Sequence, residues 1–229
     1  VVFNGNNPQS INNVTAFDLI LSGNGQKSVY NTISVVGDMQ IASPFNALAS
    51  TINLSGNLNM PSGSFDRGTS SLILNGTESQ RITSPFQMLF HNVTVNNTSG
   101  TAPQVDLGTN ITIYNNLNLT RGVVQSSSSS VLTIENGVTV NQADHSISFV
   151  SGPMRKVGVD NFIFPLGKES ISARIAITDM SGSGYFQAEY FNNGYATYTP
   201  LAAGLERVST IEYWDLDRTG GLGTANPNV

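Results

Sequence analysis

Cysteine is absent from this 229-residue chain, which excludes disulfide bonds and cysteine-based metal sites or nucleophiles. Charge is also scarce: Asp, Glu, Lys and Arg make up 11% of the residues, against roughly 25% in an average soluble domain. The net charge of -5 is mild and no basic run occurs, so a nucleic-acid partner is not expected. No apolar run approaches the roughly 18 residues of a membrane span.

Uncharged polar residues supply most of the polarity. Asparagine alone accounts for about one residue in nine, and Ser, Thr and Gly are abundant. Such side chains suit turns and suit helix interiors poorly. The chain starts at Val1 without a signal sequence and stops at "TANPNV", so we interpret it as a piece of a longer protein.

Short apolar-x-apolar triplets recur along the first two thirds of the chain. Each is typical of a short strand whose two ends face the same side. They are "LIL" (19–21), "ISV" (33–35), "MQI" (39–41), "INL" (52–54), "LNM" (58–60), "VTV" (93–95), "VDL" (105–107), "ITI" (111–113), "LNL" (117–119) and "VTV" (138–140).

Several triplets follow one another at a spacing of six residues. Val105, Ile111, Leu117 and Val123 form one such series. Three-residue faces separated by tight Asn, Gly and Ser corners are typical of a β-solenoid in which about three faces make one turn. We therefore predict a parallel β-helix over residues 1–150. The alternative is a β-sandwich, although sandwich strands usually run 5–6 residues or more.

Longer phrases also repeat. "FNGNNPQSI" (3–11) returns as "LNGTESQRI" (74–82), and "NLNMPSGSF" (57–65) returns as "NLNLTRGVV" (116–124). These echoes suggest that the chain passes the same structural point more than once, with insertions at the corners.

The composition changes at "FVSGPMRK" (149–156), where aromatic residues become about twice as frequent. Longer alternating segments follow at 161–167, 172–180, 184–191 and 209–217. They predict an antiparallel, sandwich-like module over residues 151–229 that is incomplete and covers the open end of the solenoid. The expected fold class is thus all-β.

The phrases "GPMRKVGVDNFIFPLGK" (152–168) and "EYWDLDRT" (212–219) carry a family resemblance. Together with the upstream repeats, they resemble the repetitive secreted and cell-surface proteins of Bacteroidetes. Many of those proteins are exported by the type IX secretion system and are associated with adhesion or gliding. The resemblance marks seven residues as a structural motif: Pro153, Arg155, Phe164, Pro165, Gly167, Lys168 and Trp214.

The resemblance implies a non-enzymatic structural or adhesive segment of a large bacterial protein. It implies an extracellular or cell-surface location associated with the outer membrane. The implied partners are the export machinery, outer-membrane attachment components, and surface glycans or other surface proteins. Within the motif, we expect Arg155 or Lys156 to pair with Asp160, with Phe162 and Phe164 packed beneath.

A carbohydrate-binding or carbohydrate-active β-helix is the main alternative, because such enzymes place clustered carboxylates on one exposed face. The acids of residues 1–150 are instead scattered, so we expect them to form turns and name no catalytic residue. The only histidines are His91 and His145, and we expect them on the surface or in turns. Asp144 is not expected to orient His145 as a base, because adjacent residues on a strand point to opposite faces.

Two glycine-containing segments only partly match the functional motifs that they resemble. "SGSG" (181–184) has the wrong spacing for a nucleophile elbow and predicts a hairpin loop. "DLDRTGG" (215–221) resembles an oxygen-rich calcium loop but lacks its closing acid. No cofactor is expected, and calcium at this segment is the one metal left open.

The middle residues of the triplets should face solvent. They form a mixed set rather than the regular threonine rows of an ice-binding surface, which is the third alternative. Such a set suits hydrogen bonding to glycans. Its members are Asn53, Asn59, Thr94, Asp106, Thr112, Asn118 and Thr139.

Overall fold

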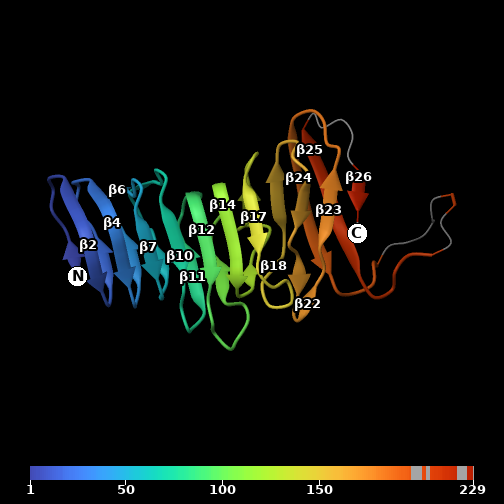
Figure 1. Cartoon of the computed structure of the whole chain (residues 1–229), viewed down its shortest axis with the longest axis horizontal. Coiled ribbons are helices and arrows are strands. Elements are labelled where there is room, and N and C mark those ends of the chain that lie inside the picture. Colours follow the sequence, from blue (N-terminus) through green and yellow to red (C-terminus); the bar gives the residue numbers. More distant parts are fainter. Residues whose placement is uncertain (197–202, 205–206, 221–225, 229) are drawn as a thin grey trace.

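The computed structural model of this chain describes residues 1–229 except 197–202, 205–206, 221–225 and 229. The described residues contain strands and no helix, and a parallel β-solenoid occupies most of the length. Its coils follow one another along the long axis, with the N-terminus at one end and antiparallel strands at the other (Figure 1). The expected all-β fold class is confirmed.

The first face of the solenoid is an eight-stranded parallel sheet with one strand from each coil. Successive coils repeat after 18 to 26 residues, as the Cα partners Val2 and Ile20 and the partners Val124 and Val150 show. The strands are β1 (Val2–Phe3), β3 (Leu19–Leu21), β5 (Met39–Ile41), β8 (Leu58–Asn59), β11 (Gln80–Thr83), β13 (Val105–Leu107), β15 (Val124–Gln125) and β18 (Val150–Ser151).

The second and third faces share four long strands that bend between them. These strands are β2 (Gln9–Ala16), β4 (Lys27–Val35), β12 (Met88–Asn96) and β14 (Ile111–Arg121). The bends in β2 and β4 fall at Asn13 and Asn31, whose φ angles are 47° and 63°. Asparagine tolerates this left-handed conformation better than most residues.

Other coils divide the same path into two separate strands. On the second face lie β6 (Pro44–Asn46), β9 (Ser64–Asp66), β16 (Leu132–Ile134) and β19 (Met154–Val157). On the third face lie β7 (Thr51–Leu54), β10 (Ser71–Leu74) and β17 (Thr139–Gln142). The pairing of β14 shows the division, because Ile111 lies beside Leu132 of β16 while Leu117 lies beside Val140 of β17.

The six-residue spacing of the triplets is therefore confirmed as a spacing between faces. Val105 lies on the first face, Ile111 on the second and Leu117 on the third, with exposed fractions of 1%, 3% and 1%. No hairpin joins Ile111 to Leu117, since both belong to β14. The sandwich alternative for this part of the chain is wrong.

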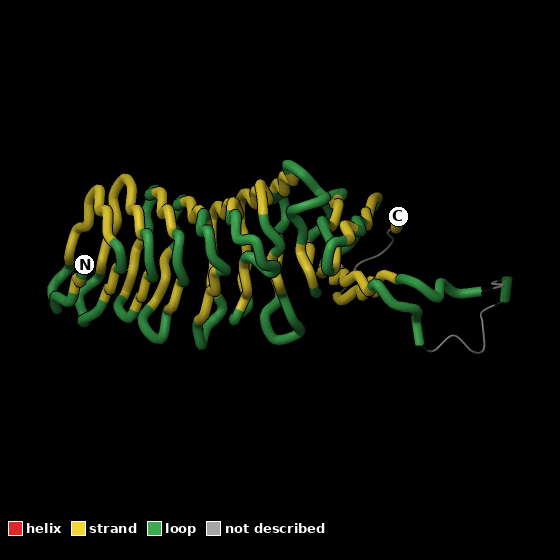
Figure 2. Tube along the Cα trace, turned by 90° about the horizontal axis from the view of Figure 1, so that it is seen from below, coloured by secondary structure: helices red, strands yellow, loops and turns green. Residues whose placement is uncertain are grey.

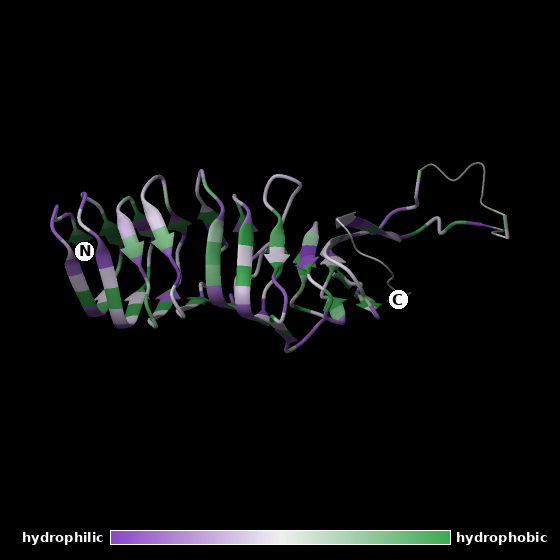
Figure 3. Cartoon of the chain, turned by 90° about the horizontal axis from the view of Figure 1, so that it is seen from above, coloured by the Kyte–Doolittle hydropathy of each residue, from purple (hydrophilic) through white to green (hydrophobic). Residues whose placement is uncertain are grey.

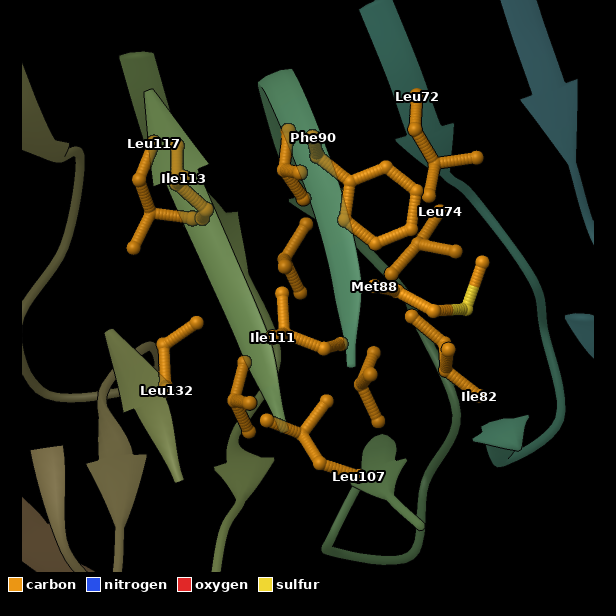
Figure 4. Packing of buried hydrophobic residues seen from close by; sticks show 14 of the residues in the cluster. Leu72, Leu74, Ile82, Met88, Phe90, Leu107, Ile111, Ile113, Leu117 and Leu132 are labelled. Carbon is orange, nitrogen blue, oxygen red and sulfur yellow. The ribbon is translucent and has the colours of Figure 1, made fainter. Parts of the chain in front are cut away.

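The inward side chains of all three faces form one continuous core. Hydrophobic and hydrophilic bands alternate along the strands (Figure 3), and the chain winds around the core coil by coil (Figure 2). Phe90, Ile111, Ile113 and Leu117 meet side chains of neighbouring coils within it (Figure 4). An aromatic column runs along the second face, where the ring of Phe65 lies 5.3 Å from both Phe45 and Phe90.

The repeated phrases do not mark the same structural point, and that interpretation is wrong. Phe3 lies on the first face and Ile11 on the second, whereas Leu74 lies on the third face and Ile82 on the first. The phrases therefore lie at different corners of the coil. All three faces require the same apolar-x-apolar pattern, so sequence similarity cannot tell one face from another.

What the two phrases share is a local turn. The Gly5 N–H donates to Oε1 of Gln9 at 2.8 Å, and the Gly76 N–H donates to Oε1 of Gln80 at 2.9 Å. In both turns the glutamine side chain folds back under the glycine. A Cβ on Gly5 or Gly76 would lie 2.8 Å or 3.0 Å from the glutamine Cδ, and at Gly76 it would also lie 2.5 Å from the carbonyl oxygen of Ser55, so both turns favour glycine.

Antiparallel strands follow the last coil. They are β20 (Phe162–Phe164), β21 (Gly167–Lys168), β22 (Ile171–Ser172), β23 (Ile175–Thr178), β24 (Gly184–Phe191), β25 (Tyr213–Gly220) and β26 (Asn226–Asn228). Strands β24 and β25 extend the larger sheet beyond β19, while β20, β23 and β26 form a separate three-stranded sheet. Parallel pairing continues through β18 and β19, so the last coil extends past the boundary expected at residue 150.

Candidate functional site

The structure gathers the seven motif residues at the C-terminal end of the solenoid, around the start of the segment that follows β19, which we call the cap (residues 158–220). Pro153 and Arg155 belong to the last coil, and the other five lie on or beside the antiparallel strands. Phe164, Pro165 and Gly167 are buried, and Arg155, Lys168 and Trp214 are half-buried. The motif therefore surrounds the point where the parallel coils end.

One part of the cap closes the first face. The N–H of Val150 on β18 donates to the carbonyl of Pro165 at 2.8 Å, and Val150 also bridges to Leu166. Gly167 follows directly. A Cβ on Gly167 would lie 2.4 Å from the carbonyl oxygen of Ile171 and 2.6 Å from the ring of Phe149, so no larger side chain fits.

Another part closes the second face. Strand β24 pairs with β19 in antiparallel register and occupies the edge that a further coil would use. Arg155 spans this junction: its guanidinium donates to Oε1 of Gln187 at 2.9 Å and lies 4.0 Å above the ring of Tyr185. The predicted covering of the open end is thus observed at two of the three faces.

The ion pair expected within the motif is formed by Lys156 and not by Arg155. The Lys156 side chain is fully buried, and its Nζ lies 3.0 Å from Oδ2 of Asp160. It also donates to the carbonyls of Glu135 and Val157 at 3.0 Å and 2.7 Å. All three ammonium donors therefore have acceptors, which offsets the cost of burying the charge.

Asp160 connects this lysine to the neighbouring coil. Its Oδ2 accepts the N–H of Gly137 at 2.5 Å. The hydrogen bond from Gly137, followed by that from Lys156, lowers the pKa of Asp160. As expected, Phe162 and Phe164 are buried nearby, with their rings 4.8 Å apart and edge to face.

Trp214 attaches β25 to the cap. Its Nε1 donates to the carbonyl of Ala173 at 3.0 Å, and its ring lies 5.3 Å from that of Tyr190. The Tyr190 hydroxyl donates to Oε2 of Glu212 at 2.6 Å. Burial, followed by the nearby Glu212 carboxylate, raises the pKa of Tyr190 to about 12. The alternating pattern of "GYFQAEYF" predicts that Tyr190 faces inward, but no sequence pattern predicts that Glu212 is its partner.

Lys168, on β21, lies against the outer face of β24, with its ammonium 5.4 Å from the ring centre of Phe191. Glu189 faces Asp215 directly across the β24–β25 pair. Burial raises the pKa of Glu189, Lys168 opposes that shift and Asp215 adds to it. Two carboxylates opposite each other on paired strands repel, so this edge of the cap carries a local negative charge.

The solenoid acids remain scattered along the coils, and in the described residues no group of three or more His, Cys, Asp or Glu side chains is placed to hold a metal. His145 lies exposed in a turn, as expected, and Asp144 directly precedes it. Asp144 accepts the Ser146 N–H at 2.9 Å and its hydroxyl at 2.6 Å, and these bonds lower the pKa of Asp144.

The two glycine-containing segments differ from their predictions. "SGSG" connects β23 to β24, which belong to different sheets, so it is not a hairpin loop. Residues 215–220 of "DLDRTGG" lie on β25 and not in a calcium-binding loop, and Gly221 lies outside the described residues.

The outward polar residues are divided among the faces. Asn53, Thr94 and Asn118 lie on the third face, while Asn59 and Asp106 lie on the first. Thr112, on the second face, is only 2% exposed, since the amide of Gln87 donates to its hydroxyl at 2.6 Å. Thr139 is exposed on β17. The set is therefore not one flat array.

The third face nevertheless carries a hydrogen-bonded ladder. Asn141 donates to Asn118 at 2.8 Å, and Asn118 donates to Thr94 at 3.4 Å. A shallow groove runs beside these three residues and is also lined by Thr120 and Gln142.

Two polar side chains, those of Lys27 and Gln80, are buried inside the solenoid. The repeated phrases mark the glutamine, but no sequence pattern marks the lysine. Lys27 is fully buried, and its Nζ donates to the carbonyls of Gly5 at 3.0 Å and Gly25 at 2.5 Å. Burial lowers the pKa of Lys27. Gln80, 1% exposed, donates to the carbonyls of Leu54 and Gly56 at 2.9 Å and 2.6 Å.

No family model, no curated protein and no solved structure matches this chain. None of the described residues belongs to a helix with the length and apolarity that a membrane span would need.

Proposed function

We propose that this chain is a stiff, non-enzymatic spacer or adhesive segment of a large bacterial cell-surface or secreted protein. We propose further that the type IX secretion system of a member of the Bacteroidetes exports it. The observation that carries the structural role is the uninterrupted parallel ladder from β1 to β18 over one continuous core.

Such stacking suits a rod physically. Each coil buries its apolar side chains against the coils on either side, so no coil is stable alone and bending the rod would separate packed neighbours. The low charge limits repulsion between adjacent rods. Outward amides and hydroxyls are then available to surface glycans, to other surface proteins or to outer-membrane attachment components.

The proposal is tested by locating the protein in cells. An antibody against this chain should label intact wild-type cells, and external protease should remove the signal. In a strain that lacks the type IX machinery, the protein should stay inside the outer membrane. Unchanged labelling of the secretion mutant would contradict the export route, and protection from protease in wild-type cells would contradict the surface location.

The polar ladder supports a second candidate, a carbohydrate-binding or carbohydrate-active β-helix. Asn118 and Asn141 present amides beside the groove, and sugar hydroxyls pair well with amides. A glycan array, with an activity screen on acidic polysaccharides with and without calcium, tests it. Binding that Asn118→Ala and Asn141→Ala abolish would favour this candidate as a binding module, and turnover would favour an enzyme.

A further inference from the structure

Strand β25 ends the larger sheet. It pairs with β24 through eight consecutive residues without a bulge. The paired residues run from Gly220 beside Gly184 to Tyr213 beside Phe191. In the part of the chain that the structure describes, no strand lies on its other side. A regular edge of this length presents a row of backbone donors and acceptors to an incoming strand.

The other free edges are less suitable. Strand β2, at the opposite end of the rod, is equally long, but its pairing shifts register at the Asn13 bend. Strands β17 and β20 contain only four and three residues. Among the described strands, β25 therefore offers the longest regular edge.

The inner face of β25 is incompletely covered. Trp214 and Leu216 pack against the core of the cap but stay half-exposed. Trp214 is held in place by Ala173 and Tyr190. A strand added beside β25 would cover Trp214 and Leu216 with its own inward side chains, which would remove apolar surface from water.

The outer face of β25 is acidic. Asp215 and Asp217 are both exposed there, and Asp215 lies beside Glu189 of the neighbouring strand β24. Basic side chains on an incoming strand would form favourable cross-strand pairs with these acids. Two copies of β25 would instead bring carboxylates together, so the same charges disfavour self-pairing.

We infer that the free edge of β25 is a strand-addition site for an extended segment of a partner polypeptide in which Lys or Arg alternates with apolar residues. Main-chain hydrogen bonds to β25 supply the affinity. The alternating side chains supply specificity, with basic residues at Asp215 and Asp217 and apolar residues over Trp214 and Leu216. This inference does not depend on how the protein is exported.

The single tryptophan of the chain makes the test direct. An eight-residue peptide that alternates Lys and Val is titrated into the full chain, and the emission of Trp214 and its quenching by acrylamide are recorded. We expect a saturable blue shift and weaker quenching. The same peptide with N-methyl groups at alternate positions should not bind, and neither should one that alternates Glu and Val.

Variants identify the edge. Asp217→Lys should weaken binding of the basic peptide about tenfold, because it replaces attraction by repulsion at one cross-strand pair. Glu78→Lys makes the same charge change at an exposed corner of the solenoid and should leave binding unchanged. The inference is overturned if no saturable change occurs, if the N-methylated or acidic peptide binds equally well, or if both variants weaken binding to the same extent.

Discussion

Gln80 shows how one buried amide can join three coils. Its Oε1 accepts from Gly76 and from the amide of Asn97 at 2.9 Å and 3.0 Å, while its Nε2 donates to the carbonyls of Leu54 and Gly56. All of its hydrogen-bonding capacity is used within the protein. Since buried groups that lose their partner pay the full cost of desolvation, we expect this side chain to be hard to replace.

Gln80→Ala should lower the free energy of unfolding by about 2–4 kcal/mol, because it leaves buried donors and acceptors unpaired. Gln9→Ala, in the similar turn of the first coil, should cost less than about 1 kcal/mol, since Gln9 is half-exposed and water can replace it. Urea unfolding of both variants measures the difference. Equal losses would contradict the role assigned to Gln80.

The free energy of unfolding should depend on pH through Asp160. Its pKa is lower in the folded chain than in the unfolded one, so its contribution is complete above the unfolded value and fades as pH falls through the folded value. Asp160→Asn should therefore cost about 1 kcal/mol at pH 7, a modest figure because the carboxylate is 41% exposed. The two proteins should converge once the pH has fallen below the folded-state pKa of Asp160.

Chemical unfolding of wild type and Asp160→Asn at several pH values checks this expectation. Glu78→Gln is the control for the loss of one exposed negative charge. A difference between wild type and Asp160→Asn that stays constant down to about pH 2 would show that ionisation of Asp160 is not the cause.

A single coil is the repeating element of the solenoid, and its length sets what can be removed. Met39 and Leu58 are Cα partners on the first face, so residues 39–57 make up one coil of 19 residues. Deleting them joins Asp38 to Leu58. The Arg81 N–H now donates to Oδ1 of Asn57 at 2.8 Å, and the carboxylate of Asp38 can accept this hydrogen bond in its place.

Deletion of residues 39–57 should leave a cooperatively folding chain that is one coil shorter. Its unfolding free energy should be lower, because one set of coil interfaces is lost. Deletion of residues 39–48 should prevent folding, since it removes half a coil and brings the wrong faces into register. Circular dichroism and urea unfolding distinguish these outcomes. A folded half-coil deletion would contradict the three-face register.

For the molecule as a whole, the cap covers the C-terminal end of the stacked coils at two of their three faces. Without it, β18 and β19 would present free edges, and the buried side chains of Phe149 and Met154 would be exposed. Open, apolar sheet edges promote association between molecules. The cap therefore covers the sheet edges and apolar side chains of the last coil, as each coil covers those of the coil beside it.

Removal of residues 158–229 should convert the protein into a self-associating species. Light scattering after size-exclusion chromatography should show oligomers whose mass rises with concentration, while the full chain serves as the control. A truncated chain that stays monomeric and unfolds cooperatively would mean that the coils close their own end.

The triplet pattern determined the parallel solenoid, its three faces and the six-residue step between them. This was possible because an inward position must be apolar in every coil, and alternation within a strand is a local property of the chain. The later aromatic segments likewise indicated antiparallel strands and a covered end. The ion pair at Asp160 could also be predicted, because its partner Lys156 lies only four residues earlier in the sequence.

The positions of Gln80 and Lys27, the corner occupied by each repeated phrase, and the pairing of β24 with β19 depended on tertiary contacts. Each is decided by which segment lies one coil away, and that separation varies from 18 to 26 residues. A buried amide or ammonium is tolerated only where carbonyls of a neighbouring coil converge on it. The sequence of one coil does not contain that information, because the partners come from another.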